Sequence, residues 1–128
     1  MNKINTLLFD LDGTLLDTRD FIIQATQHAL LTHGYPVPEQ SIISKLVGKP
    51  FNEYYRELTG LDDSTVLQTT HRAFQLTNLH LSVLFPQTLH TLETLHNRGY
   101  KMAVITTRSK ITSLETLRNL RSLRLTDI

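Results

Sequence analysis

The chain has 128 residues, 40% of them apolar and 20% charged, with a formal net charge of +1 at pH 7 and no cysteine. The length and composition are typical of one globular domain or a small domain with an insertion. The lack of cysteine excludes disulfides and thiol catalysis, and the near-neutral charge excludes a broad positive electrostatic field that would attract nucleic acid. No apolar run approaches the ~20 residues that span a bilayer, and the N-terminal segment is a poor signal peptide, so we expect a cytoplasmic protein without membrane contacts.

Residues 4–10 are predicted to form a buried strand that ends in two aspartates. Successive side chains of a strand alternate between its faces, so Asp10 and Asp12 can project into one crevice. Gly13 then lets the backbone turn away. Two carboxylates this close repel each other unless a shared proton or a cation intervenes, and a hard cation such as Mg²⁺ meets that need.

The rest of the sequence is predicted to form helices with one further strand. Apolar spacing predicts helices over about 17–33, from Pro38 to Leu46 and over about 51–59, and a longer one that begins at Asp62 or Asp63 and includes Leu76. Residues 82–86 are predicted to be a linker, followed by a helix over 87–98 and a buried strand over 100–106. A last helix is expected over 110–124, with an inward apolar face of Ile111, Leu114, Leu117 and Leu120.

The string DLDGTLLDT at residues 10–18 resembles the first motif of the haloacid dehalogenase-like hydrolases, in particular their phosphoglycolate phosphatase and pyrophosphatase branch. This resemblance covers nearly the whole chain. It implies that Asp10 is the nucleophile that becomes an aspartyl-phosphate, that Asp12 is the general acid and base, and that both act with Mg²⁺. The chemistry agrees, because a carboxylate that takes a phosphoryl group covalently splits one hard hydrolysis into two easier steps.

Residues 103–108, AVITTR, resemble the second motif of that family, with Thr106 at its hydroxyl position. A hydroxyl and the backbone amides near the start of a helix can hold a phosphate oxygen. Thr107 and Arg108 are candidate phosphate or substrate contacts, with helix capping and a solvated charge as alternatives. Lys49 lies where relatives place a substrate-specificity loop, and it is either a substrate contact or a solvated turn residue.

The expected fold is α/β, with a partial Rossmann-like parallel sheet and an inserted all-helical cap domain. Residues 1–14 and 86–128 are assigned to the α/β core and residues 15–85 to the cap. We expect the core to be incomplete and the sequence to be truncated at its C-terminus, because the family's later lysine and acidic pair have no counterpart here. Two strands are few for such a sheet, so self-association is expected, or a partner protein that supplies the missing parts.

Three functions remain open on the sequence. The first is a phosphatase that acts on a small phosphorylated metabolite through an aspartyl-phosphate, with activity expected to be weak or absent because later motifs are missing. The second is a non-catalytic remnant or binding module. The third is a phosphomutase of the β-phosphoglucomutase type, which shares the first motif. The residues do not identify the substrate.

Overall fold

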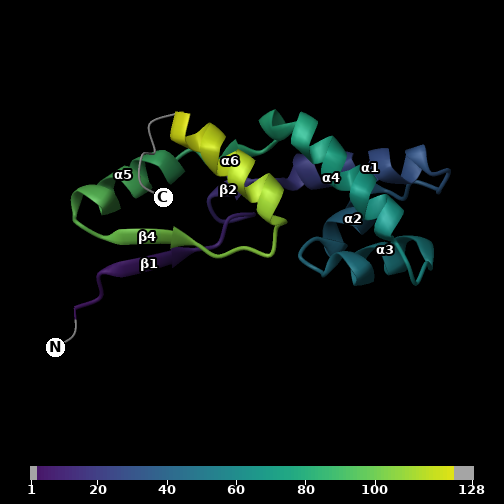
Figure 1. The fold of residues 1–128 in the computed structure, drawn as a ribbon, viewed down its shortest axis with the longest axis horizontal. Helices are drawn as coiled ribbons and strands as arrows, with labels where there is room; N and C mark the ends of the chain where they lie inside the picture. The colour runs from purple at the N-terminus through teal and green to yellow at the C-terminus, as the bar shows by residue number, and fades with distance from the viewer. Residues whose placement is uncertain (1–2, 123–128) are drawn as a thin grey trace. The chain divides into compact units, whose positions relative to one another are not determined.

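The computed structural model describes residues 3–122, and their contacts divide the protein into two compact units. The first unit holds residues up to Thr18 and those from Ser82 onward, and the second holds Arg19–Leu81 (Figure 1). Residues 123–128, which the sequence assigns to the core, lie outside the described part. In the described part, no helix is both long and apolar enough to cross a membrane.

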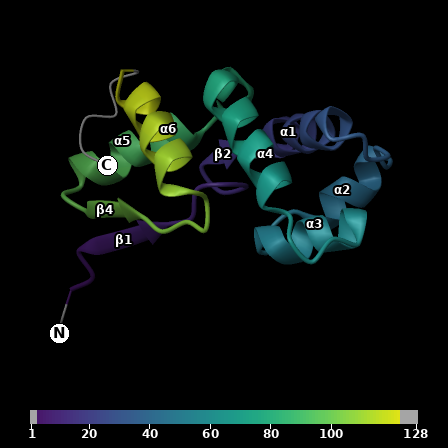
Figure 2. The same cartoon turned by 45° about the vertical axis from the view of Figure 1, so that its right-hand side comes forward.

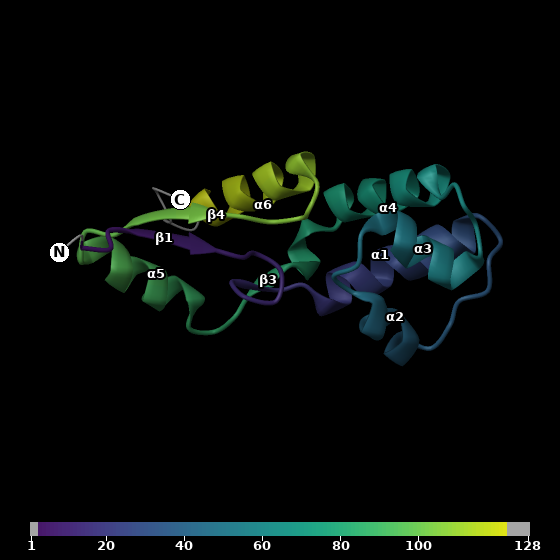
Figure 3. The ribbon, with the colours of Figure 1, turned by 90° about the horizontal axis from the view of Figure 1, so that it is seen from below.

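The first unit is built on two parallel strands, β1 (Thr6–Phe9) and β4 (Lys101–Val104). Their register pairs Thr6 with Lys101 and Phe9 with Val104. Helices α5 (Thr88–Asn97) and α6 (Lys110–Ser122) lie on opposite sides of this strand pair (Figure 3). One sheet face packs on a core of buried and half-buried side chains, namely Phe9, Leu11, Leu15, Leu16, Leu84, Leu89, Leu92, Met102 and Val104.

The first unit also contains a short antiparallel pair that the sequence does not predict. Strand β2 (Leu16–Asp17) pairs with β3 (Val83–Leu84), where the sequence predicts a linker. The hydroxyl of Thr88 also donates to the carbonyl of Leu15 at 2.9 Å in a buried position. These bonds bring residues 15–18 and 82–85 into the first unit, although the sequence assigns 15–85 to the cap.

The face of α6 that is buried is polar, which corrects the expected apolar face. Ile111 and Leu114 are exposed, whereas the buried side chains of this helix are Thr112, Ser113 and Thr116. Thr116 accepts a hydrogen bond from Arg108 at 2.8 Å, so this face of the helix contacts a charged side chain. The burial of Leu120 lies outside the described side chains.

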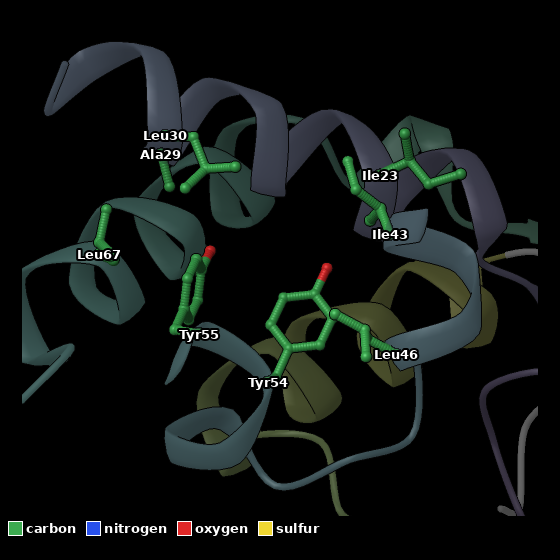
Figure 4. Close-up of a cluster of buried hydrophobic side chains, with 8 residues drawn as sticks. All are labelled: Ile23, Ala29, Leu30, Ile43, Leu46, Tyr54, Tyr55 and Leu67. Carbon is green, nitrogen blue, oxygen red and sulfur yellow. The ribbon is translucent and has the colours of Figure 1, made fainter. Parts of the chain in front are cut away.

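The second unit is wholly helical, as Figure 2 shows from a second angle. It contains α1 (Arg19–Thr32), α2 (Gln40–Leu46), α3 (Phe51–Thr59), α4 (Thr65–Thr77) and the 3₁₀ turn η1 (Leu79–Leu81). Helix α1 packs along α4. The core between these helices consists of Ile23, Ala29, Leu30, Ile43, Leu46, Tyr54, Tyr55 and Leu67 (Figure 4).

Two pairs of polar side chains inside this helical core are hydrogen-bonded to each other. The hydroxyls of Thr26 and Tyr54 lie 2.6 Å apart, and the hydroxyl of Tyr55 lies 2.8 Å from Nδ1 of His71. Burial raises the pKa of Tyr54 to about 12, against the opposing effect of its bond with Thr26. Hydrogen bonds of this kind offset the cost of taking polar groups out of water.

Candidate active site

The carboxyl ends of β1 and β4 meet at one edge of the first unit. The N–H of Ile105 donates to the carbonyl of Phe9 at 2.8 Å, which continues the parallel ladder one residue beyond β4. Asp10 therefore follows β1 directly at this edge, level with Ile105, and Thr106 is the next residue after Ile105. Such an edge is where open parallel sheets bind their ligands.

A tight turn over residues 13–15 follows Asp12, and the side chain of Leu11, between the two aspartates, points inward. Leu11 is fully buried, and its carbonyl accepts the N–H groups of Leu15 and Leu16, both at 3.0 Å. Gly13 has φ +78, a left-handed conformation that costs an L side chain strain, and its N–H donates to the carbonyl of Leu16 at 2.8 Å. The turn leaves Asp10 exposed and Asp12 partly exposed.

Asp12 forms an ion pair with Arg108 that the sequence does not predict. Nε of Arg108 donates to Oδ2 of Asp12 at 3.1 Å, and Nη2 forms a short contact with Oδ1. The arginine side chain is 5% exposed and the aspartate side chain 27%. Two parallel bonds from a guanidinium to one carboxylate are the strong, orienting form of this interaction.

Further contacts hold the guanidinium of Arg108. Nη1 donates to the hydroxyl of Thr116 at 2.8 Å, and Nη2 lies 3.4 Å from the hydroxyl of Ser82. Sequence reasoning misses both partners, because Ser82 lies in a stretch expected to be a linker and Thr116 sits among apolar positions of a helix. Arg108 is expected near the substrate, and its contact in the structure is with Asp12.

The two candidate phosphate-binding threonines differ in their surroundings. Thr106 is half-buried, and its hydroxyl oxygen accepts the backbone N–H of Arg108 at 3.1 Å. That oxygen is an acceptor in this contact, so its own proton can be donated elsewhere. Thr107 is exposed. Both stand in the loop between β4 and the start of α6 at Lys110.

Asp10 and Lys49 make fewer and more exposed contacts than Asp12 does. The hydroxyl of Thr14 lies 3.5 Å from Oδ2 of Asp10, at the limit of a hydrogen bond. Lys49 belongs to the second unit and forms an exposed ion pair with Glu57. A role for Lys49 toward substrate stays a prediction.

The arrangement does not fit a Mg²⁺ ion held jointly by Asp10 and Asp12. Over residues 3–122, no three or more His, Cys, Asp or Glu side chains gather in a way that could hold a metal. Both oxygens of Asp12 accept bonds from Arg108. The carboxylate of Asp10 is the more exposed of the two and is not bonded to Arg108 in these contacts.

The family model described as haloacid dehalogenase-like hydrolase matches residues 7–128. The protein belongs to the haloacid dehalogenase-like hydrolases. This match spans nearly all of the sequence and includes the DLDGT segment and both strand ends described above. The family resemblance stated from the sequence is thereby confirmed.

Curated relatives agree with this family and are longer than this chain. A pyrophosphatase PpaX of Anoxybacillus flavithermus is 33% identical over 113 aligned residues, and the alignment covers 86% of this chain and 51% of that protein. A pyrophosphatase PpaX of Bacillus pumilus is 35% identical over 88% of this chain and 52% of its own length. The chain spans about half the length of the curated relatives it matches.

Solved structures show the same fold. A haloacid dehalogenase-like family hydrolase from Streptococcus pneumoniae aligns with a TM-score of 0.83 and 27% identity, covering 92% of this chain and 56% of that one. A haloacid dehalogenase-like hydrolase from Bacteroides fragilis aligns with a TM-score of 0.77 and 30% identity, over 91% of this chain and 58% of its own. The expected α/β fold with a small parallel sheet is confirmed at this level.

Proposed function

We propose that this protein carries the nucleophile half of a phosphatase site that acts on a small phosphorylated metabolite. The observation that carries this proposal is the parallel register of β1 and β4, which ends both strands at one edge with Asp10 after one and Thr106 after the other. A phosphoryl group needs a nucleophile on one side and hydrogen-bond donors on its oxygens. The proposal is that the two strand ends supply these groups to the same phosphoryl group.

Asp10 is the proposed nucleophile, because it is the more exposed of the two carboxylates. Its oxygen would attack phosphorus, the bond from phosphorus to the leaving oxygen would break, and water would then hydrolyse the aspartyl-phosphate. Asp12 would protonate the leaving oxygen and later take a proton from the attacking water. Its bond pattern with Arg108 fixes its orientation but must open before it can carry a proton.

The hydroxyl of Thr106 and the backbone at Thr107 are the proposed phosphate donors. The contact between Thr106 and the N–H of Arg108 supports this role, because it orients the hydroxyl oxygen. Members of this family typically depend on Mg²⁺. We propose the same dependence for turnover here, with the exposed carboxylate of Asp10 as the side chain that would hold the ion.

The nearest alternative is a phosphate-binding module without turnover. One observation favours it, namely that Arg108 occupies both oxygens of the proposed acid and base. A phosphomutase would share Asp10 and Asp12, and no contact among the described residues separates it from a phosphatase.

The experiment that tests the proposal is a Mg²⁺-dependent phosphatase assay on purified protein of verified intact mass. Pyrophosphate, phosphoglycolate and p-nitrophenyl phosphate are suitable substrates. Release of phosphate is expected, and Asp10→Asn should reduce it to background because an amide oxygen is a poor nucleophile. Asp20→Asn, an exposed aspartate in the first turn of α1, is the matched control and should leave the rate unchanged.

Two results would count against the proposal. Turnover that persists in Asp10→Asn would move the nucleophile elsewhere or reveal a contaminant. Phosphate binding with no turnover for any substrate would favour the binding module instead.

A further inference from the structure

Arg108 is a buried cation at the edge where the two parallel strands end. Its side chain is 5% exposed, and its fork of donors holds the carboxylate of Asp12, just after β1. Ser82 and Thr116 accept further bonds from it. Its backbone N–H donates to the hydroxyl of Thr106, one of the proposed phosphate donors. The guanidinium therefore joins the loop after β4 to the segment after β1, which are the two segments proposed to meet a phosphoryl group.

The unequal exposure of the two partners decides how an anion can reach the arginine. The side chain of Asp12 is 27% exposed, whereas that of Arg108 is nearly covered. Of the guanidinium nitrogens, Nε and Nη2 are bonded to the carboxylate, and Nη1 is bonded to Thr116. An anion from solvent therefore approaches the fork from the side of the carboxylate, and it reaches Nε and Nη2 by taking the place of Asp12.

The burial of Arg108 also explains why its bonds to Asp12 open only for another anion. An arginine out of water that loses its carboxylate without a replacement is left as an uncompensated charge, which is costly. A phosphate group can replace the carboxylate, because the guanidinium fork fits both groups and a phosphate dianion carries more negative charge. The ion pair should thus stay closed in the free protein and open when a phosphate binds the arginine.

We propose that Arg108 exchanges the carboxylate of Asp12 for the phosphate group of the substrate. In the free protein the arginine holds both oxygens of Asp12 and so keeps this carboxylate from proton transfer. When a phosphate binds, Arg108 contacts the phosphate oxygens, and Asp12 is released to act as acid and base. This inference deepens the proposed function and rests on it, since it assigns Arg108 to the phosphate of the same site.

Calorimetric titration of the whole protein with inorganic phosphate, at constant ionic strength and without divalent cations, tests whether Arg108 binds the anion. Arg108→Gln should weaken phosphate binding by about tenfold or more, because a charge-assisted fork is lost. Arg108→Lys keeps the charge without the fork, so an affinity between the two is expected. Arg118→Gln is the matched control and should leave the affinity unchanged, because Arg118 pairs with Glu115 on an exposed part of α6.

Asp12→Asn tests the exchange itself. An amide lacks the charge that holds the arginine, so phosphate binding should tighten by about tenfold. Loss of a negative charge alone also favours anion binding, and the double variant with Arg108→Gln separates the two causes. If Asp12→Asn acts by freeing the arginine, most of its gain should disappear in the Arg108→Gln background. Asp20→Asn removes an exposed aspartate of the second unit and should give no gain.

The outcomes of the titration are separate from those of the phosphatase assay. Unchanged phosphate affinity in the folded Arg108→Gln protein would overturn the inference, as would an Asp12→Asn gain of equal size in both backgrounds. Absence of phosphate binding in both the unaltered protein and Asp12→Asn would overturn it as well. The expected binding pattern without turnover contradicts the proposed function alone. Asp10-dependent turnover with a KM that Arg108→Gln leaves unchanged contradicts this inference alone.

A second measurement uses the unaltered protein and so does not depend on the folding of a variant. The Nε–H proton of Arg108 and the carboxyl carbon of Asp12 report by NMR on the two sides of the ion pair. Saturating phosphate should shift both resonances, with the carboxyl carbon moving toward the value of a solvated aspartate, whereas NaCl at equal ionic strength should shift neither. Saturation with phosphate that leaves the Asp12 resonance in place would overturn the inference.

Discussion

His71 is a fully buried histidine whose surroundings favour the neutral ring. Its Nδ1 lies 2.8 Å from the hydroxyl of Tyr55, and the ring of Phe51 meets it edge-on with the centroids 4.8 Å apart. Burial, together with the smaller effect of the nearby charge of Arg72, lowers the pKa of His71 to about 3. Because an unfolded polypeptide offers no such environment, the stability of the second unit is linked to pH at this residue.

This linkage predicts that the second unit loses stability as pH falls below 6.5, the ordinary pKa of histidine. Between that value and about 3 the unfolded state binds a proton that the folded state does not. The free energy of unfolding should therefore fall by at most about 1.4 kcal/mol per pH unit in this window. Urea unfolding followed by tyrosine fluorescence at neutral and mildly acidic pH measures the slope.

Replacement of the ring identifies the residue responsible. His71→Phe should flatten the slope, since it removes the titrating group and keeps an aromatic ring. His80→Phe alters an exposed histidine of the same unit and should leave the slope as it is. A slope that is unchanged in His71→Phe would assign the acid sensitivity to other groups.

Sequence could predict the aspartates but not their partners. The i, i+2 spacing after an apolar run is local information, so Asp10 and Asp12 could be placed at a strand end. Arg108 lies 96 positions from Asp12, and a contact at that separation depends on the fold rather than on a pattern. His71 escapes sequence reasoning for a similar reason, because its burial depends on α3 packing against α4.

Helix α3 shows how one residue ends an element. Gly60 has φ +77 at the C-terminal cap, and its N–H donates to the carbonyl of Arg56 at 2.7 Å. A Cβ added to Gly60 would meet no atom within 4 Å, so packing does not oppose a side chain there. The glycine is therefore needed for its left-handed backbone alone.

Gly60→Ala should lower the free energy of unfolding by about 1 kcal/mol, the cost of a left-handed backbone for alanine. Gly60→Asn should cost less, because asparagine tolerates this conformation better. Thermal and urea unfolding of the three proteins measures the order. If the Gly60→Ala protein were as stable as the unaltered protein, or the Gly60→Asn protein less stable than Gly60→Ala, backbone strain would not explain the glycine.

At the scale of elements, the sequence predicts long helices and strands well and very short ones poorly. The predicted strand over 100–106 corresponds to β4 at Lys101–Val104, and the helix predicted over 87–98 to α5 at Thr88–Asn97. Strands β2 and β3 have two residues each, which is too few for an alternating pattern to be recognised in the sequence. The spacing of apolar residues predicts α6 but selects the wrong face as buried. The polar face is buried instead, because Thr116 contacts Arg108.

The first unit leaves apolar side chains of its parallel strand pair open to solvent. Leu8 on β1 and Ile105 after β4 are each 60% exposed. The pair forms a sheet of two strands among the described residues, fewer than independent sheets usually need. Exposed apolar side chains beside strand edges favour association with other molecules.

We expect the protein to self-associate through this surface of Leu8 and Ile105. Sedimentation velocity over a range of concentrations should show a growing oligomer fraction. Leu8→Lys should shift the protein toward monomer, because a charge on the surface opposes its burial. Leu31→Lys is the control, since Leu31 on α1 in the second unit is also exposed. A monomer at all concentrations, or equal dissociation by both variants, would contradict this expectation.

The measurement that tests the central claim most directly is detection of the phosphoryl group on its acceptor. The protein is incubated with Mg²⁺ and pyrophosphate or p-nitrophenyl phosphate, quenched in acid, digested and examined by peptide mass spectrometry. We expect a phosphoryl adduct on Asp10, in the peptide that follows β1, and its loss in Asp10→Asn. A phosphoryl group on another residue, or hydrolysis that proceeds at the same rate in Asp10→Asn, would contradict the assignment of Asp10 as the nucleophile.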